Sequence, residues 1–167
     1  MMTESNRRPL QPEIMALFPS GTAAPTFAEW VANHAGLEQV LGVAGMLSPS
    51  FYEVNGVVVW DKHVAEQLQD AELTTPFGGD ATTTERYFNV LNLAEFFLMS
   101  ADEAVERTEL VRAFGSVVEH FWQLALVDRF PDRRFLFEIK EDLFNEEGLC
   151  LTFWQQRDAE EPDHRSG

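Results

Sequence analysis

The sequence predicts an α+β fold in which an antiparallel sheet of about four strands packs against about five helices. Two segments, residues 51–60 and 134–155, have the alternation and turn residues of β-hairpins. The remaining segments place apolar side chains at helical spacing behind capping residues. A chain of 167 residues needs only one domain to bury its apolar groups.

Two helices are expected in the first third of the chain. Residues Thr26 to Glu29 form a capping box, the pattern in which two side chains bind the free N–H groups at a helix start. Gly36 is expected to close this helix. Helical spacing then continues until Pro49, through Leu37, Val40, Leu41, Ala44 and Met46.

Residues 51–60 carry the strongest local signal. Two β-rich runs are joined by Asn55-Gly56, the dipeptide that type I′ turns prefer. This turn places Val54 opposite Val57 and thereby sets the register of the pair. Both faces of the hairpin are mostly apolar, so we expect both to be covered.

Three more helices are expected after the first hairpin. Asp61 caps a short one. A second capping box begins at Thr82, and it opens a nearly apolar helix that is predicted to reach Met99. Ser100 caps a long helix that ends before Pro131, because proline cannot continue it.

The second hairpin begins where the period of the apolar residues changes from helical to alternating, at Arg134. Residues 134–140 are therefore predicted as a strand and residues 149–154 as its antiparallel partner. Residues 141–148 are the expected connecting loop. The two hairpins can share one sheet.

The net charge of the chain, −16, lies on the predicted globular part. Residues 1–13 sum to zero and residues 157–167 to −2, from four acids and two arginines, which leaves −14 for the residues between them. Such a surface repels nucleic acid and anionic lipid, and it favours a partner with a basic surface. A further hypothesis is that the protein mimics DNA. Such mimicry requires ordered rows of carboxylates, and the spacing of Asp and Glu along the chain does not show them.

No sequence pattern points to a catalytic residue, a metal site or a cofactor. Cys150 is the only cysteine, so neither a disulfide within the chain nor a cysteine metal site is expected. The four histidines are far apart and lack the spacings of zinc sites. No window approaches the roughly 20 apolar residues of a membrane helix. No signal peptide is recognisable either, so the cytoplasm is the expected location.

A polar stripe on the nearly apolar helix offers one candidate site. Glu85, Asn89 and Asn92 recur at positions i, i+4 and i+7. Together with Asp80 and His63, Glu85 and Asn89 would line a pocket for a small ligand or a substrate. The alternative is that the stripe is the only solvated face of its helix.

The loop of the second hairpin offers the other candidate site. Two apolar residues stand there between two acidic pairs, in the order Glu141, Asp142, Leu143, Phe144, Glu146 and Glu147. An apolar anchor with a negative rim suits a basic protein surface. In the alternative, both apolar side chains fold back onto the domain and only the carboxylates face water.

Four stretches of the chain resemble a group of small bacterial proteins of uncharacterised function. They are Phe51 to Trp60, the Gly78-Gly79-Asp80 turn with Glu85 and Asn89, Phe130 to Phe135, and Thr152 to Gln155. The resemblance implies a bacterial cytoplasmic protein and transfers no site residue.

These observations lead to two main hypotheses about function. The first is a non-enzymatic interaction protein, such as an immunity-type inhibitor or an accessory subunit, that binds a basic protein surface as a monomer or a homodimer. The second is an enzyme or a small-ligand-binding protein that uses the polar stripe. In both, a single domain at residues 13–156 lies between flexible ends at residues 1–12 and 157–167.

Overall fold

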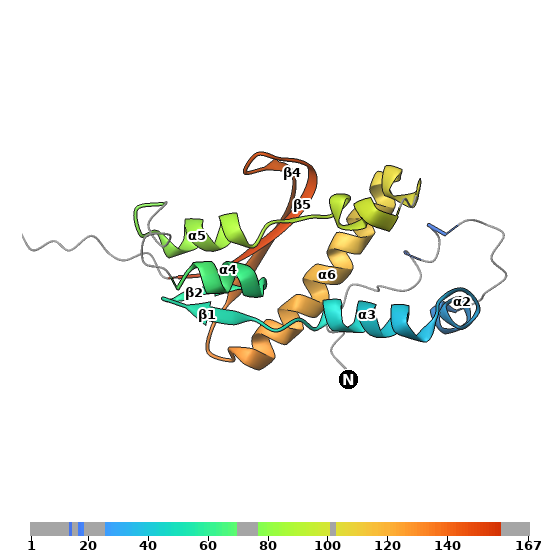
Figure 1. Cartoon of the computed structure of the whole chain (residues 1–167), viewed down its shortest axis with the longest axis horizontal. Coiled ribbons are helices and arrows are strands. Elements are labelled where there is room, and N and C mark those ends of the chain that lie inside the picture. Colours follow the sequence, from blue (N-terminus) through green and yellow to red (C-terminus); the bar gives the residue numbers. More distant parts are fainter. Residues whose placement is uncertain (1–13, 15–16, 19–25, 70–76, 101–102, 158–167) are drawn as a thin grey trace, which may run out of the picture.

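The computed structural model describes Ile14 and residues 17–18, 26–69, 77–100 and 103–157. The elements are α2 (Phe27–His34), α3 (Leu37–Leu47), β1 (Tyr52–Val54), β2 (Val57–Val59), α4 (Lys62–Gln67), α5 (Ala81–Phe88), β3 (Leu91–Asn92), the 3₁₀ helices η1 (Glu95–Ser100) and η2 (Glu103–Glu106), α6 (Thr108–Arg129), β4 (Phe135–Leu143) and β5 (Glu146–Gln155). The α+β class is confirmed (Figure 1). The predictions for residues 1–12 and for the tail after Arg157 lie outside the described residues.

The first hairpin has the predicted turn and register. Val54 pairs with Val57 in the antiparallel sheet of β1 and β2, and Asn55 adopts the positive φ (51°) that the turn requires. Both faces are covered, as expected. Val58 belongs to the main core, whereas Val57 and Val59 pack in a second cluster under α4.

The second hairpin lies in a separate sheet of three strands, in the order β3, β5, β4. β4 and β5 pair from Phe135 opposite Gln155 to Leu143 opposite Glu146, so the strands run further towards the tip than predicted. The hairpins therefore share no backbone ladder. The link between them is made by side chains of α5, as described below.

The nearly apolar helix predicted from Thr82 to Met99 is wrong beyond its second turn. α5 ends at Phe88, and Leu91 and Asn92 form β3 on the edge of β5. The chain continues as the 3₁₀ helix η1. Pairing with β5 satisfies backbone groups while it buries Leu91, a gain from tertiary contacts that local apolar spacing does not reveal.

α6 covers the β4–β5 hairpin and completes the main core (Figure 1). It begins at Thr108 rather than at Ser100, since η2 intervenes, and it ends at Arg129 as predicted. Its buried side, which includes Trp122 and Leu126, packs on Phe153 and neighbouring residues. α6 has 22 residues, yet no helix in the described part of the chain is long and apolar enough to cross a membrane.

Gly115 allows α6 to approach the three-stranded sheet. A Cβ atom at this position would lie 2.6 Å from Cδ1 of the buried Leu93 and 3.3 Å from Cδ1 of Ile139. We expect Gly115→Ala to lower the free energy of unfolding by about 1 to 2 kcal/mol, because overpacking outweighs the better helix propensity of alanine. Gly45→Ala in α3, where a Cβ atom meets nothing within 4 Å, is the control and should not destabilise the protein. Urea unfolding of both variants measures the difference.

Candidate functional site

Glu85, on α5, is fully buried, and its carboxylate accepts four hydrogen bonds. Oε1 accepts from the backbone N–H of Val58 (2.8 Å) and from Nη2 of Arg157 (2.8 Å). Oε2 accepts from the backbone N–H of Gln155 (2.7 Å) and from Nη1 of Arg157 (2.8 Å). The same hydrogen bonds raise the pKa of Arg157 above its ordinary value. A buried carboxylate needs such partners, because an unpaired buried charge is strongly unfavourable.

Asn89, the residue that caps the end of α5, is also fully buried. Its Nδ2 donates to the backbone carbonyls of Val58 (2.8 Å) and Phe153 (3.2 Å). Its Oδ1 accepts from the backbone N–H of Trp60 (3.3 Å). The side-chain amide is thus engaged at both ends.

Glu85 and Asn89 together link the two sheets. Both contact the outward edge of the first hairpin and the free part of the β5 edge. Glu85 contacts Val58 and Gln155, whereas Asn89 reaches Trp60 and Phe153. The residue numbers thus rise along the first hairpin and fall along β5, which is the order of antiparallel strands. The two side chains therefore take the place of a row of backbone hydrogen bonds. The third residue of the predicted stripe, Asn92, lies in β3 and donates to the carbonyl of Glu147 (2.8 Å).

The other two residues of the predicted ligand pocket are exposed and have local partners. Asp80 is the N-cap of α5, and its hydrogen bond with the Thr83 hydroxyl lowers the pKa of the Asp80 carboxyl. His63 lies on α4, with Nδ1 at 3.6 Å from Oε2 of Glu66. Among the described residues, no three His, Cys, Asp or Glu side chains are grouped closely enough to hold a metal ion. This geometry adds no support to the ligand-pocket hypothesis.

The tip of the second hairpin is tighter than the loop predicted at residues 141–148. Only Phe144 and Asn145 form the turn between β4 and β5, and both have positive φ (53° and 70°). Leu143 is buried, and the half-buried ring of Phe144 lies 5.7 Å from the ring of Tyr87. The two apolar side chains therefore fold back onto the domain, as in the alternative prediction.

The carboxylates of the tip are exposed, namely those of Glu141, Asp142, Glu146 and Glu147. Asp142 accepts a hydrogen bond from the backbone N–H of Gly148 (3.0 Å), and Glu141 lies 3.7 Å from Arg112. The tip presents negative charge without a free apolar anchor. Partner binding by its six predicted residues stays a prediction.

The environment of the cysteine is that of a packing residue rather than a reactive thiol. Cys150 lies in β5, is fully buried, and pairs with Asn92 in the sheet. Burial raises the pKa of its thiol, which disfavours the reactive thiolate. Its surroundings are those of a packing residue.

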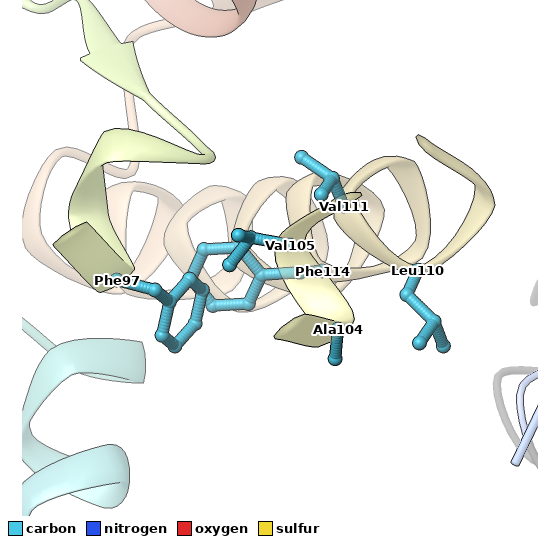
Figure 2. A pocket seen from close by; sticks show the side chains of 6 residues that line it. All are labelled: Phe97, Ala104, Val105, Leu110, Val111 and Phe114. Carbon is cyan, nitrogen blue, oxygen red and sulfur yellow. The ribbon is translucent and has the colours of Figure 1, made fainter. Parts of the chain in front are cut away.

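An apolar pocket opens where η1 and η2 meet the start of α6 (Figure 2). Its cavity volume is about 120 Å³. All six lining side chains are apolar: Phe97, Ala104, Val105, Leu110, Val111 and Phe114. The rings of Phe97 and Phe114 lie 4.9 Å apart and form one wall. Phe96, which is 45% exposed, contacts both rings and extends the apolar surface outward.

Acidic residues are the sequence neighbours of several lining residues. Glu103 and Glu106 flank the two lining residues of η2, are exposed, and form no ion pair within the described residues. The carboxyl of Glu109 has a lowered pKa, because its own backbone N–H and Arg107 both bind it. The described part of residues 95–109 holds four acids and one arginine, a net charge of −3. We call these lining residues with Glu103, Glu106 and Glu109 the acidic-rimmed pocket.

The sequence patterns do not single out this pocket. They assign Phe97 to a long helix that the structure replaces with η1, and they assign Leu110 and Phe114 to the core side of the following helix. The available signal is the density of apolar and acidic residues around the predicted helix start at Ser100. That density does not show that two short 3₁₀ helices fold against α6.

Comparison with known proteins finds no family model, no curated protein and no solved structure that matches the chain.

Proposed function

We propose that the chain is a non-enzymatic interaction protein whose acidic-rimmed pocket receives an apolar side chain from a basic segment of another protein. One observation supports this most directly: the pocket is open and lined by apolar side chains, while the exposed residues Glu103 and Glu106, which precede and follow two lining residues in the sequence, form no ion pair among the described residues. Protein interfaces gain most of their affinity from a few large side chains that fill pockets. Opposite charge around such a pocket speeds association and selects the partner.

An inhibitor of the immunity type or an accessory subunit whose partner protein is basic would act in this way. The proposal places the chain in the cytoplasm, where a free thiol such as Cys150 stays reduced. It also moves the interface from the hairpin tip to the pocket, because the tip has buried Leu143 and half-buried Phe144.

Charge reversal at the rim tests the proposal. The double variant Glu103→Lys, Glu106→Lys is expected to capture its partner from a lysate of the encoding organism at least about tenfold less efficiently than the natural chain. The matched control is Glu146→Lys, Glu147→Lys at the hairpin tip, which makes the same change of charge and should retain capture. Circular dichroism confirms that both variants are folded.

Two outcomes would contradict the proposal. Loss of capture only in the tip variant would assign the interface to the hairpin tip. Equal loss in both variants would show that the partner responds to net charge rather than to this pocket.

A further inference from the structure

The acidic-rimmed pocket is small for a site that receives a side chain of another protein. Its cavity volume is about 120 Å³. A closed apolar cavity of about 150 Å³, known from another protein, holds one benzene molecule. The pocket therefore has the size of one aliphatic side chain such as leucine, and an indole, which is larger than benzene, cannot enter it whole.

The walls of the pocket belong to the packed part of the domain. Figure 2 shows the rings of Phe97 and Phe114 on one side, Leu110 on the other and Ala104 between them. Val111 is buried in the main core, and Phe114 packs against the same core. Because protein cores are close-packed, a larger group could widen the cavity only by displacing core side chains.

The pocket also lacks groups that could form hydrogen bonds with an occupant. All six lining side chains are apolar. The backbone N–H groups of Leu110 and Val111 both donate to the carbonyl of Arg107, at 2.9 and 3.1 Å. The carbonyl of Ala104 accepts from the N–H of Arg107 (3.1 Å). A hydroxyl or an indole N–H placed here would lose its hydrogen bonds with water without replacement.

We infer that the acidic-rimmed pocket selects a leucine-sized aliphatic side chain and rejects tyrosine and tryptophan. The inference rests on the proposed function and adds which side chain the partner presents. Interface pockets commonly receive tyrosine or tryptophan, whose polar group finds a hydrogen-bond partner, and this pocket offers none. Leu110 is the residue that determines the selection, since its half-buried side chain bounds the pocket opposite Phe97 (Figure 2).

Small amines that carry one such group test the inference on the purified full chain. 3-Methylbutylamine, tyramine and tryptamine present an isobutyl, a phenol and an indole group, each on an ammonium. NMR titration of the amide signals of Val105 and Val111 measures their dissociation constants, which are expected at about millimolar concentrations for molecules of this size. 3-Methylbutylamine should bind at least about tenfold more tightly than either of the other two.

Leu110→Ala should change this selectivity. The variant widens the pocket, so tryptamine is expected to gain at least about tenfold relative to 3-methylbutylamine, whereas a merely structural role of Leu110 would weaken all probes alike. Leu124→Ala is the matched control, because Leu124 lies on the same helix, is 55% exposed and does not line the pocket. It should keep the selectivity of the natural chain. Thermal unfolding confirms that both variants are folded.

Three results would overturn the inference. They are equal binding of tryptamine or tyramine and 3-methylbutylamine to the natural chain, an unchanged selectivity in Leu110→Ala, and no shift with any probe at about 10 mM. A fourth probe, 3-methylbutanoate, carries the same isobutyl group with a negative charge. If it binds as tightly as the amine, the selection by size stands and the charge preference of the proposed function fails. If selectivity is absent while Glu103→Lys, Glu106→Lys still loses its partner, the proposed function stands without this inference.

Discussion

Replacement of Glu85 by alanine is expected to lower the free energy of unfolding by about 3 to 5 kcal/mol, the usual range when one partner of a buried ion pair is removed. The variant leaves the backbone N–H groups of Val58 and Gln155 without their acceptor and deprives the guanidinium of Arg157 of its carboxylate partner. The loss acts on both sheets, since Val58 lies in β2 and Gln155 ends β5. A stability of the usual 5 to 15 kcal/mol would fall by a large fraction.

Urea unfolding of Glu85→Ala beside Glu66→Ala measures this effect. Glu66 also faces a cation, Lys62, at 3.4 Å, but both side chains are more than half exposed. Exposed pairs contribute about 0 to 1 kcal/mol, so the control should change little. A loss below about 1 kcal/mol in Glu85→Ala would mean that the link between the sheets is not needed for stability.

Trp122→Ala is expected to cost a similar amount, about 3 to 5 kcal/mol. The indole lies between the rings of Phe51, Trp60 and Phe153, at centroid distances of 6.0, 5.3 and 6.0 Å. Its removal opens a cavity at the centre of the main core. It also frees the carbonyl of Met46, the backbone anchor of α3.

Phe121→Ala is the neighbouring control for this prediction. Phe121 precedes Trp122 on α6 but is 39% exposed and points away from the core, so its removal should cost less than about 1 kcal/mol. Thermal unfolding of the two variants at low protein concentration keeps self-association out of the comparison. Equal losses would contradict the assignment of a buried side and an outer side to α6.

The elements that the sequence predicts correctly are those with a signal within a few residues. Asn55-Gly56 determines both the turn and the register of the first hairpin, because few other residues accept its positive φ angles. The change of period at Arg134 identifies β4 in the same way. Such signals depend on backbone conformation and on which face is buried, and both are local.

The segment from Thr82 to Met99 is mispredicted because its decisive contacts are remote. Apart from its polar stripe the segment is nearly apolar, a pattern compatible with a buried helix or a buried strand. The ladder that makes Leu91 and Asn92 a strand comes from Leu151 and Cys150, about 60 residues later in the chain. Nothing in the segment itself indicates that partner.

The role of the polar stripe also depends on contacts with residues that are remote in the sequence. Spacing correctly placed Glu85 and Asn89 on one side of a helix, but a polar stripe can face water, a ligand or backbone groups of another element. Here it meets Val58 and Phe153, which belong to two different hairpins. The pocket at η1 and η2 could not be predicted from the sequence for a related reason, since short 3₁₀ helices carry little periodic signal.

The most direct test of the proposed function is the salt dependence of partner binding at the acidic-rimmed pocket. Once a partner is captured and purified, titration calorimetry can measure its dissociation constant for the natural chain and for Glu103→Lys, Glu106→Lys between about 0.05 M and about 0.5 M salt. We predict that the natural chain binds most tightly at low salt and weakens steadily as salt rises, while the variant binds weakly throughout. Equal affinity of the two chains, or tighter binding at high salt, would contradict the proposal.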